Sequence, residues 1–239
     1  MGLTNNGESL CSEHAQRVRE MFARISPRYD LLNHLLSGNV DKRWRRLVVA
    51  KLKGLVPQGS RVLDVACGTG DLSIQLFESI DTQVTGVDFC RPMLEIAARK
   101  GPQIMFIEAD ALQLPFAALA FDAATIAFGL RNLSSVEVGL QELRRVLRPG
   151  GWLMVLEFST PVVPGFRTLF EFYFGRVLPR VGGWISGSRE AYQYLPDSVV
   201  RFASQEQLAS MMCDAGFERV GFENLTGGIA ALHWGQRPA

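Results

Sequence analysis

The chain has 239 residues and a formal net charge of +1; 47% of its residues are hydrophobic and 21% are charged. This is the composition of a globular protein large enough for one sizeable α/β domain, without the basic excess typical of nucleic-acid binding. The four cysteines include no close pair and there are only three histidines, so we expect no disulfide framework and no metal site, and a reducing compartment, the cytoplasm.

The pattern of apolar residues predicts an N-terminal helical region followed by alternating strands and helices. Helices are expected at residues 12–36 (one or two, interrupted at Pro27), 41–52, 71–79, 92–100, 135–147 and 204–215. Strands are expected at residues 61–66, 83–88, 104–108, 121–127, 152–158, 217–223 and 229–234. Such alternation predicts a parallel sheet with right-handed crossovers, and Gly227-Gly228 joins the last two strands into a hairpin at the sheet edge.

The first predicted strand, Val62 to Ala66, is followed by Gly68, Gly70 and the start of a helix. Glycines at such a turn allow a sharp bend and let a ligand approach main-chain N–H groups. The helix dipole favours an anionic group there. A tight turn without a ligand explains the same residues equally well, so this feature alone leaves ligand binding open.

Asp88 ends the next predicted strand and lies about 20 residues beyond the glycines, where a carboxylate binds the hydroxyls of a ribose. The alternative is an N-cap of the next helix. Pro92 favours Cys90 or Arg91 as the helix boundary, so Asp88 lies early for a cap and ribose binding is preferred.

Two cofactor classes share this arrangement. A dinucleotide motif usually has a third glycine where this chain has Ser73, which favours a ligand with a carboxylate over one with a pyrophosphate. S-adenosylmethionine fits, with a carboxylate for the glycine loop, a ribose for Asp88 and an adenine further along. A nicotinamide-dependent oxidoreductase remains as an alternative.

The regular alternation stops between Thr160 and Val200. Aromatic and aliphatic residues crowd a predicted helix around Phe166 to Leu178, which is too short and too charged to span a bilayer. It is either a lid packed on the core or an apolar wall for an apolar substrate or a membrane surface. We expect one domain over 1–239, with an N-terminal helical cap (1–55), a cofactor-binding core (56–160), a lid or substrate insertion (160–203) and a C-terminal helix and hairpin (204–239).

Several motifs, in order along the chain, resemble one enzyme family. Residues 62–70 (VLDVACGTG) and 145–151 (RVLRPGG) resemble two motifs of class I S-adenosylmethionine methyltransferases. More specific are residues 29–33 (YDLLN) with Trp44, 127–132 (AFGLRN), 156–159 (LEFS), 191–196 (AYQYLP) and 223–229 (ENLTGGI). Together, from Phe22 to Gly235, they resemble the ubiquinone/menaquinone biosynthesis C-methyltransferases of the UbiE/MenG type.

The resemblance implies a class I methyltransferase fold, Rossmann-like, with a seven-stranded, mostly parallel sheet and a C-terminal antiparallel hairpin. It implies methyl transfer from S-adenosylmethionine to a ring carbon of a polyprenylated quinol, most directly demethylmenaquinol to menaquinol, and in some members the ubiquinone precursor. A non-catalytic subunit built on this fold is a further alternative. Together with the apolar helix around Phe166 to Leu178, such a substrate leads us to expect peripheral contact with the inner face of the membrane. The charge balance leads us to expect no nucleic acid, and a homodimer is left open.

The same resemblance maps Thr69, Asp88, Asp110 and Ala111 onto cofactor-contacting positions. Asp110 follows a predicted strand, so its carboxylate can accept from the adenine amino group while the Ala111 N–H donates to a ring nitrogen. A turn or N-cap aspartate is the alternative for Asp110. We expect Asp64 to serve the ammonium end of the cofactor.

This chain departs from the family pattern at three places. Asp41 stands where members usually have a histidine, Ala127 where they often have a serine, and Arg148 where they have a lysine. The first departure removes any catalytic role for that histidine. The second leaves the cofactor-binding position of Ala127 without a side-chain contact.

The methyl acceptor needs an electron-rich ring, and a nearby cation favours its phenolate. Arg131, beside Asn132, is the candidate catalytic cation; the alternative is a structural arginine paired with a carboxylate. Side chains expected to orient or contact the substrate are Tyr29, Tyr192, Tyr194 and His233, although a histidine in an apolar strand is more often a core residue.

Overall fold

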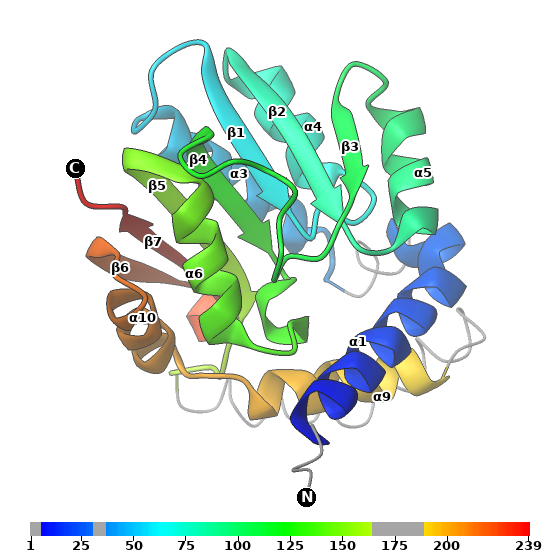
Figure 1. The fold of residues 1–239 in the computed structure, drawn as a ribbon. Coiled ribbons are helices and arrows are strands. Elements are labelled where there is room, and N and C mark those ends of the chain that lie inside the picture. The colour runs from blue at the N-terminus through cyan, green and yellow to red at the C-terminus, as the bar shows by residue number, and fades with distance from the viewer. Residues whose placement is uncertain (1–5, 31–36, 164–188) are drawn as a thin grey trace, which may run out of the picture.

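The computed structural model describes residues 6–30, 37–163 and 189–239. Its centre is a seven-stranded sheet with the strand order β3-β2-β1-β4-β5-β7-β6 (Figure 1). The strands are β1 (Ser60–Val65), β2 (Thr82–Asp88), β3 (Met105–Glu108), β4 (Phe121–Ala127), β5 (Leu147–Phe158), β6 (Glu218–Leu225) and β7 (Ala230–Gln236). β1 to β5 are parallel, and β7 is antiparallel to β5 and β6. The predicted sheet and its C-terminal hairpin are confirmed.

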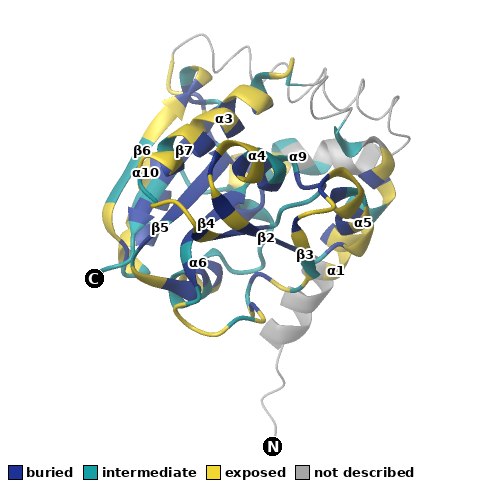
Figure 2. Cartoon of the chain, turned by 90° about the horizontal axis from the view of Figure 1, so that it is seen from above, coloured by how far each residue is buried: buried dark blue, intermediate teal, exposed yellow. Residues whose placement is uncertain are grey.

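Helices cover both faces of the sheet. They are α1 (Asn6–Ile25), α3 (Val40–Lys53), α4 (Asp71–Ser79), α5 (Arg91–Lys100), α6 (Val136–Val146), α9 (Arg189–Arg201) and α10 (Gln205–Asp214), with short 3-10 turns η1 (Ser26–Arg28), η2 (Leu130–Asn132) and η4 (Thr226–Gly228). The inner strands between them are largely buried, whereas the edge strands β3 and β6 are partly exposed (Figure 2).

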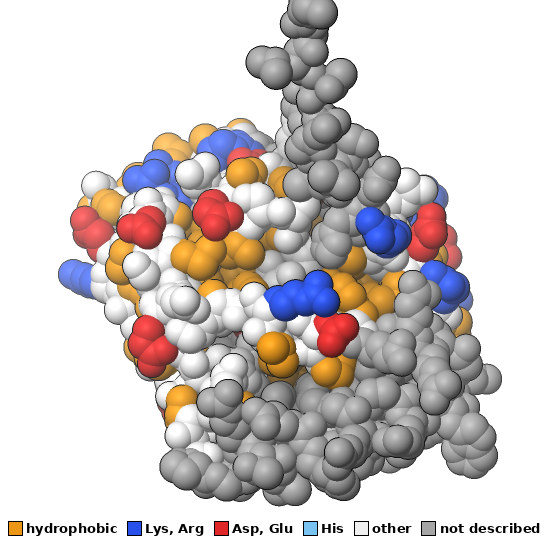
Figure 3. Space-filling view, turned by 90° about the horizontal axis from the view of Figure 1, so that it is seen from below, with side chains coloured by type: hydrophobic (Ala, Val, Ile, Leu, Met, Phe, Trp, Pro, Cys, Tyr) orange, Lys and Arg blue, Asp and Glu red, His pale blue; other side chains and the backbone are white. Residues whose placement is uncertain are grey.

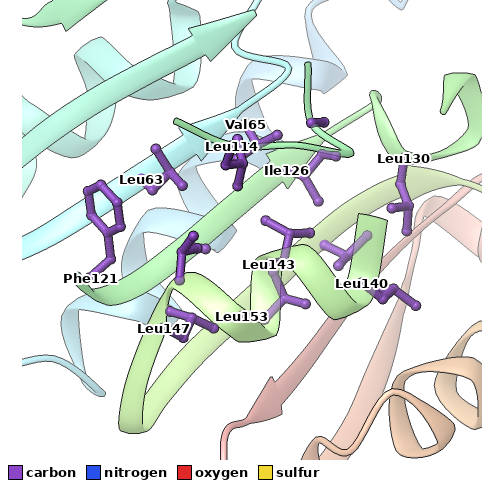
Figure 4. Close-up of a cluster of buried hydrophobic side chains, with 14 of the residues drawn as sticks. Leu63, Val65, Leu114, Phe121, Ile126, Leu130, Leu140, Leu143, Leu147 and Leu153 are labelled. Atoms are coloured by element: carbon purple, nitrogen blue, oxygen red, sulfur yellow. The ribbon is translucent and has the colours of Figure 1, made fainter. Parts of the chain in front are cut away.

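Successive residues of β1 point to opposite faces, as the pleat of a strand requires. Val62 belongs to the core beneath α3 and α4, whereas Leu63 and Val65 belong to the core beneath α6 and α10. In the second core, Leu140 and Leu143 of α6 lie against the strands (Figure 4). Burial on both faces explains why the strands read as nearly continuous apolar runs.

The carboxyl ends of the parallel strands form one edge of the sheet. The chain runs from β1 outward to β2 and β3 and then returns to β4 on the other side of β1, so β1 and β4 flank the point where strand order reverses. Ligands bind at such a switch point in open α/β sheets. α1, which contacts α5 and α9, crosses below this edge in Figure 1. Figure 3 views this end, where hydrophobic side chains gather between scattered charged ones.

Two element boundaries differ from the sequence expectation by more than two residues. β5 begins at Leu147 rather than 152, because Phe121 pairs with Leu147 while Ala123 pairs with Trp152, so the intervening residues bulge out of the ladder. A Cβ at Gly151 would lie 2.9 Å from the Arg148 carbonyl oxygen, which explains the glycine in this bulge. The N-terminal helix α1 begins at Asn6, earlier than expected.

The predicted apolar helix around 166–178 lies outside the described residues, and the division into four parts remains a prediction. Within the described ranges, no helix combines the length and apolar character needed to cross a bilayer.

Candidate functional site

A cavity of about 540 Å³ opens at the carboxyl edge of the sheet. Residues that follow β1, β2, β3 and β4 line it, and α1 covers it. Its volume is within the range of about 300–1,000 Å³ that small-molecule sites occupy. The predicted site residues that line it are Tyr29, Gly68, Asp88, Asp110, Ala111, Ala127 and Asn132.

The glycine loop forms the turn between β1 and α4. Gly68 and Gly70 have φ of +56° and +82°, values that favour glycine, and Ala66 shares this region with φ of +51°. A Cβ at Gly70 would lie 3.0 Å from the Ala97 Cβ and 3.1 Å from the Phe106 ring, so Gly70 also permits close packing. Gly68 faces the cavity, whereas Gly70 serves the turn and the start of α4.

Asp88 is 7% exposed at the end of β2. Its Oδ2 accepts from the Gly68 N–H and its Oδ1 from the Cys90 N–H, both at 2.8 Å. Burial raises the pKa of Asp88 to about 6, although these backbone hydrogen bonds act in the opposite direction. Because each carboxylate oxygen can accept two hydrogen bonds, Asp88 can order the loop and still accept from ribose hydroxyls.

Asp110 and Ala111 follow β3 on the same rim. Asp110 is exposed, and its Oδ1 accepts from the Leu112 N–H at 2.8 Å, which makes it a turn aspartate. It also lines the cavity beside the nearly buried Ala111. Ala127 lines the cavity at the end of β4. These three positions surround the region where the adenine is expected.

Asp64 lies beneath the glycine loop and is 1% exposed. Its Oδ2 accepts from Ser73 Oγ at 2.6 Å and its Oδ1 from Thr125 Oγ1 at 2.7 Å. Burial raises the pKa of Asp64 to about 6 against the effect of these hydroxyls. The structure therefore places Asp64 beneath the loop and outside the residues that line the cavity, and its expected role toward the ammonium end of the cofactor stays a prediction. Ser73, at the position of the third glycine of a dinucleotide motif, is its partner.

Thr69 is also buried and lies outside the cavity lining. Its hydroxyl donates to Asp30 Oδ1, so this side chain connects the glycine loop to the N-terminal segment. Asp41, at the position of the family histidine, accepts from Ser37 Oγ at 2.6 Å and pairs with the buried Arg45.

Arg131 does not supply the free cation that the sequence analysis expected. Its side chain is 5% exposed, and Nη1 lies 2.6 Å from Oε1 of Glu157, whose side chain is 1% exposed. Nη1 also donates to the Phe128 carbonyl at 2.6 Å, and Nε to Ser198 Oγ at 3.3 Å. A carboxylate buried on β5 requires a cation beside it, and Arg131 is that cation.

Asn132 brings a polar group into the cavity. Its Oδ1 accepts from the Tyr194 hydroxyl at 3.0 Å, and its Nδ2 donates to the Phe128 carbonyl at 3.3 Å. Burial raises the pKa of Tyr194, which therefore remains a donor at neutral pH. The structure thus brings Asn132 and Tyr194 together, with Asn132 in the cavity lining and Tyr194 outside it. Contact of either side chain with the substrate stays a prediction.

Tyr29 also lines the cavity, close to Gly68. It contacts Phe22 of α1 edge-to-face, with ring centroids 5.9 Å apart. Tyr192 belongs to α9, and its side chain lies outside the described part of the chain.

His233 lies away from the cavity, in the middle of β7. It is 2% exposed, its Nε2 lies 2.9 Å from the Gln205 carbonyl oxygen, and its ring packs 5.2 Å from that of Phe222. Burial lowers its pKa, so it is a neutral core residue. The expected substrate contact is not formed, because β7 places this residue under α10.

Sequence reasoning assigned no role to two residues that shape the site. Glu157 carries a signal that could have revealed its pairing, since a carboxylate inside an apolar strand needs a counter-ion. Phe128 lines the cavity with φ of +58°, a conformation that is uncommon for a bulky residue and has no sequence signature. Its carbonyl oxygen accepts hydrogen bonds from the side chains of Arg131 and Asn132, and these two bonds stabilise the strained turn.

Comparisons with known proteins find relatives over nearly the whole length of the chain. The model of the ubiE/COQ5 methyltransferase family matches residues 11–237. A demethylmenaquinone methyltransferase of Thermus thermophilus is 52% identical, with 91% of this chain and 100% of that protein covered. A ubiquinone/menaquinone biosynthesis C-methyltransferase UbiE of Geobacter sp. strain M21 is 46% identical, with 95% and 98% covered. A solved SAM-dependent methyltransferase of Thermotoga maritima shares the fold, with a TM-score of 0.65, 22% identity, and coverage of 91% and 98%.

The comparisons confirm the class I methyltransferase fold, enzymatic activity and S-adenosylmethionine as cofactor. They set aside the oxidoreductase and the non-catalytic subunit. The family match and the high identity over nearly the whole length lead to one conclusion: the chain belongs to the ubiE/COQ5 methyltransferase family.

Proposed function

We propose that the protein methylates a ring carbon of a polyprenylated quinol, most directly demethylmenaquinol to menaquinol, with the ubiquinone precursor as a second acceptor. The names of the relatives support this proposal, since they are demethylmenaquinone or ubiquinone/menaquinone methyltransferases at 41–52% identity. The observation that carries it is the cavity, whose lining combines the carboxylate of Asp88 with aromatic side chains and the amide of Asn132.

The residues present fit S-adenosylmethionine. When bound, it supplies an electrophilic methyl group. Asp88 retains acceptor capacity for the ribose, the Gly68 main chain borders the cavity, and Asp110 and Ala111 offer an acceptor and an N–H to the adenine. Ala127 adds an apolar surface without a hydroxyl.

The acceptor side of the cavity is aromatic and apolar. Tyr29, Phe128 and Leu133 line it, and Asn132 is oriented from behind by Tyr194. A planar ring can pack against such a wall, while the Asn132 amide can form a hydrogen bond with one of the ring hydroxyls. Methyl transfer to carbon depends on holding that ring in line with the donor, and a rigid wall supplies this positioning.

We assign Arg131 a positioning role in this wall. Through the Phe128 carbonyl it fixes the turn that carries both Phe128 and Asn132, and its charge is balanced by Glu157. It acts on the acceptor through these neighbours and not through contact with the ring.

A prenyl tail dissolves in a bilayer, so we further propose that the protein works from the cytoplasm in peripheral contact with the inner face of the membrane. The tail's apolar surface supports this proposal. The exposed apolar side chains of Val162 and Val163 adjoin the insertion from which such a contact was expected.

Quinone profiling by mass spectrometry of cells that lack the protein tests the proposed function. We expect the quinone pool to lack the ring methyl group and the wild-type gene to restore it, whereas Asp88→Ala should not. An unchanged quinone pool in these cells would refute the proposal.

A further inference from the structure

Charged groups fasten the N-terminal segment across the glycine loop. Asp30, just after η1, accepts a hydrogen bond from the Thr69 hydroxyl and pairs with Lys100 of α5, with 2.9 Å between Oδ2 and Nζ. Lys100 also pairs with Asp71, the first residue of α4, at 2.5 Å between Nζ and Oδ1. One ammonium group therefore bridges the N-terminal segment and the helix that begins at the glycine loop.

This segment is also the cover of the cavity. Tyr29 lines the cavity directly above Gly68, where a Cβ would meet Tyr29 Cε1 at 4.0 Å. Along α1, Arg19 and Phe22 extend the cover to the far rim, where Arg19 pairs with Glu108. Residues 29–30 thus lie between solvent and the loop that is expected to hold the cofactor carboxylate.

The bridge formed by Asp30, Lys100 and Asp71 consists of charged side chains that solvent ions can reach. Burial lowers the pKa of Lys100, but its hydrogen bonds and charge interactions with Asp71 and Asp30 raise it more, so the net pKa is above the ordinary value. The side chains of Lys100 and Asp30 are 32% and 30% exposed. An ion pair exposed to this degree is modest in strength and weakened by salt, which suits a contact that must open and close.

We propose that Lys100 is a positioning residue that holds residues 29–30 closed over the glycine loop, and that S-adenosylmethionine enters and leaves through release of the Asp30–Lys100 contact. The inference rests on S-adenosylmethionine as cofactor and is independent of the methyl acceptor. Because the Asp30–Lys100 contact joins two side chains of the protein and includes no cofactor atom, its loss should destabilise the closed cover in the free and the loaded states alike. The association and dissociation rates therefore rise together while Kd stays the same.

Stopped-flow measurement of S-adenosylmethionine binding and of its displacement by S-adenosylhomocysteine tests this inference. In Lys100→Met both rates should rise by about three- to tenfold, with Kd within about twofold of wild type. Lys100→Arg keeps the charge and should remain near wild type. Arg99→Met, an exposed neighbour on the same helix, is the matched control and should leave both rates unchanged.

A second variant reports on the same contact from the other side. Asp30→Asn retains an oxygen for Thr69 but loses the ion pair, so it should accelerate exchange like Lys100→Met, and the double variant should be no faster than either. Raising the salt concentration should accelerate wild type more than Lys100→Met, in which the Arg19–Glu108 pair of the cover remains.

Unchanged rates in both single variants would overturn the inference. Additive acceleration in the double variant would also overturn it. Faster dissociation with an unchanged association rate and a proportional loss of affinity would overturn it as well, because Lys100 would then stabilise the bound cofactor directly. Should Lys100→Met fail to fold, Asp30→Asn decides between these outcomes.

Discussion

Replacing Asp88 with alanine tests the assignment of the cofactor site most sharply. The change removes a charge-assisted hydrogen bond to ribose worth about 1.5–3 kcal/mol, which corresponds to about 10- to 150-fold weaker binding of S-adenosylmethionine. It also removes the acceptor of the Gly68 and Cys90 N–H groups. Gly68 borders the cavity, where water can replace the lost bond, so we expect a stability loss of about 1–4 kcal/mol.

These two effects are separable. Calorimetric titration well below the unfolding temperature of the variant measures affinity, and urea unfolding measures stability. Asp81→Ala, at an exposed position before β2, is the control and should bind like wild type. A folded Asp88→Ala protein with wild-type affinity would refute the ribose assignment.

The pKa of Asp88 gives this prediction a pH signature. Burial raises that pKa to about 6, so the carboxylate becomes protonated as pH falls through 6 and loses one acceptor. Affinity of the wild type should therefore fall below pH 6, by up to about tenfold per pH unit, while that of Asp88→Ala stays flat. Folding stability changes in the opposite sense: the raised pKa disfavours the folded state above pH 6, and this cost disappears as pH falls toward about 4.

Two further substitutions test neighbouring assignments. Asp64→Asn removes a buried carboxylate whose pKa is raised to about 6, so stability should increase by about 1–3 kcal/mol at pH 8, and this gain should shrink below pH 6 and vanish toward about pH 4. S-adenosylmethionine affinity should stay unchanged; weaker binding in calorimetry would return Asp64 to the cofactor site. Arg131→Met leaves Glu157 buried without its cation and should cost about 3–5 kcal/mol in urea unfolding, most of it recovered by adding Glu157→Gln. Turnover of that double variant should stay at least about tenfold below wild type, and full turnover would contradict the positioning role.

Patterns local in sequence predicted the parts of the fold that depend on local physics. The turn after β1 and the acidic residue at the end of β2 follow from apolar strands that stop at glycine or aspartate, and the parallel order brings such ends to one edge. The start of β5 was missed because a bulge opposite Phe121 continues the ladder across what reads as a turn.

Side-chain partners were harder to predict, because they depend on residues far apart in sequence. Arg131 pairs with Glu157, which lies 26 positions away in the sequence, and Thr69 donates a hydrogen bond to Asp30, which lies 39 positions away. Spacing alone could not distinguish a cation free for substrate from one bound to Glu157. His233 shows the reverse case, since its apolar surroundings already favoured a core residue.

Transfer of labelled methyl from S-adenosylmethionine to a prenylated demethylmenaquinol, followed by mass spectrometry of the product, tests the central claim most directly. The account predicts label on a ring carbon, only with the reduced quinol, because its hydroxyls make the ring electron-rich, and little label with Asp88→Ala. Label on an oxygen, equal transfer to the oxidised quinone, or no transfer by the folded, cofactor-bound wild type would contradict it.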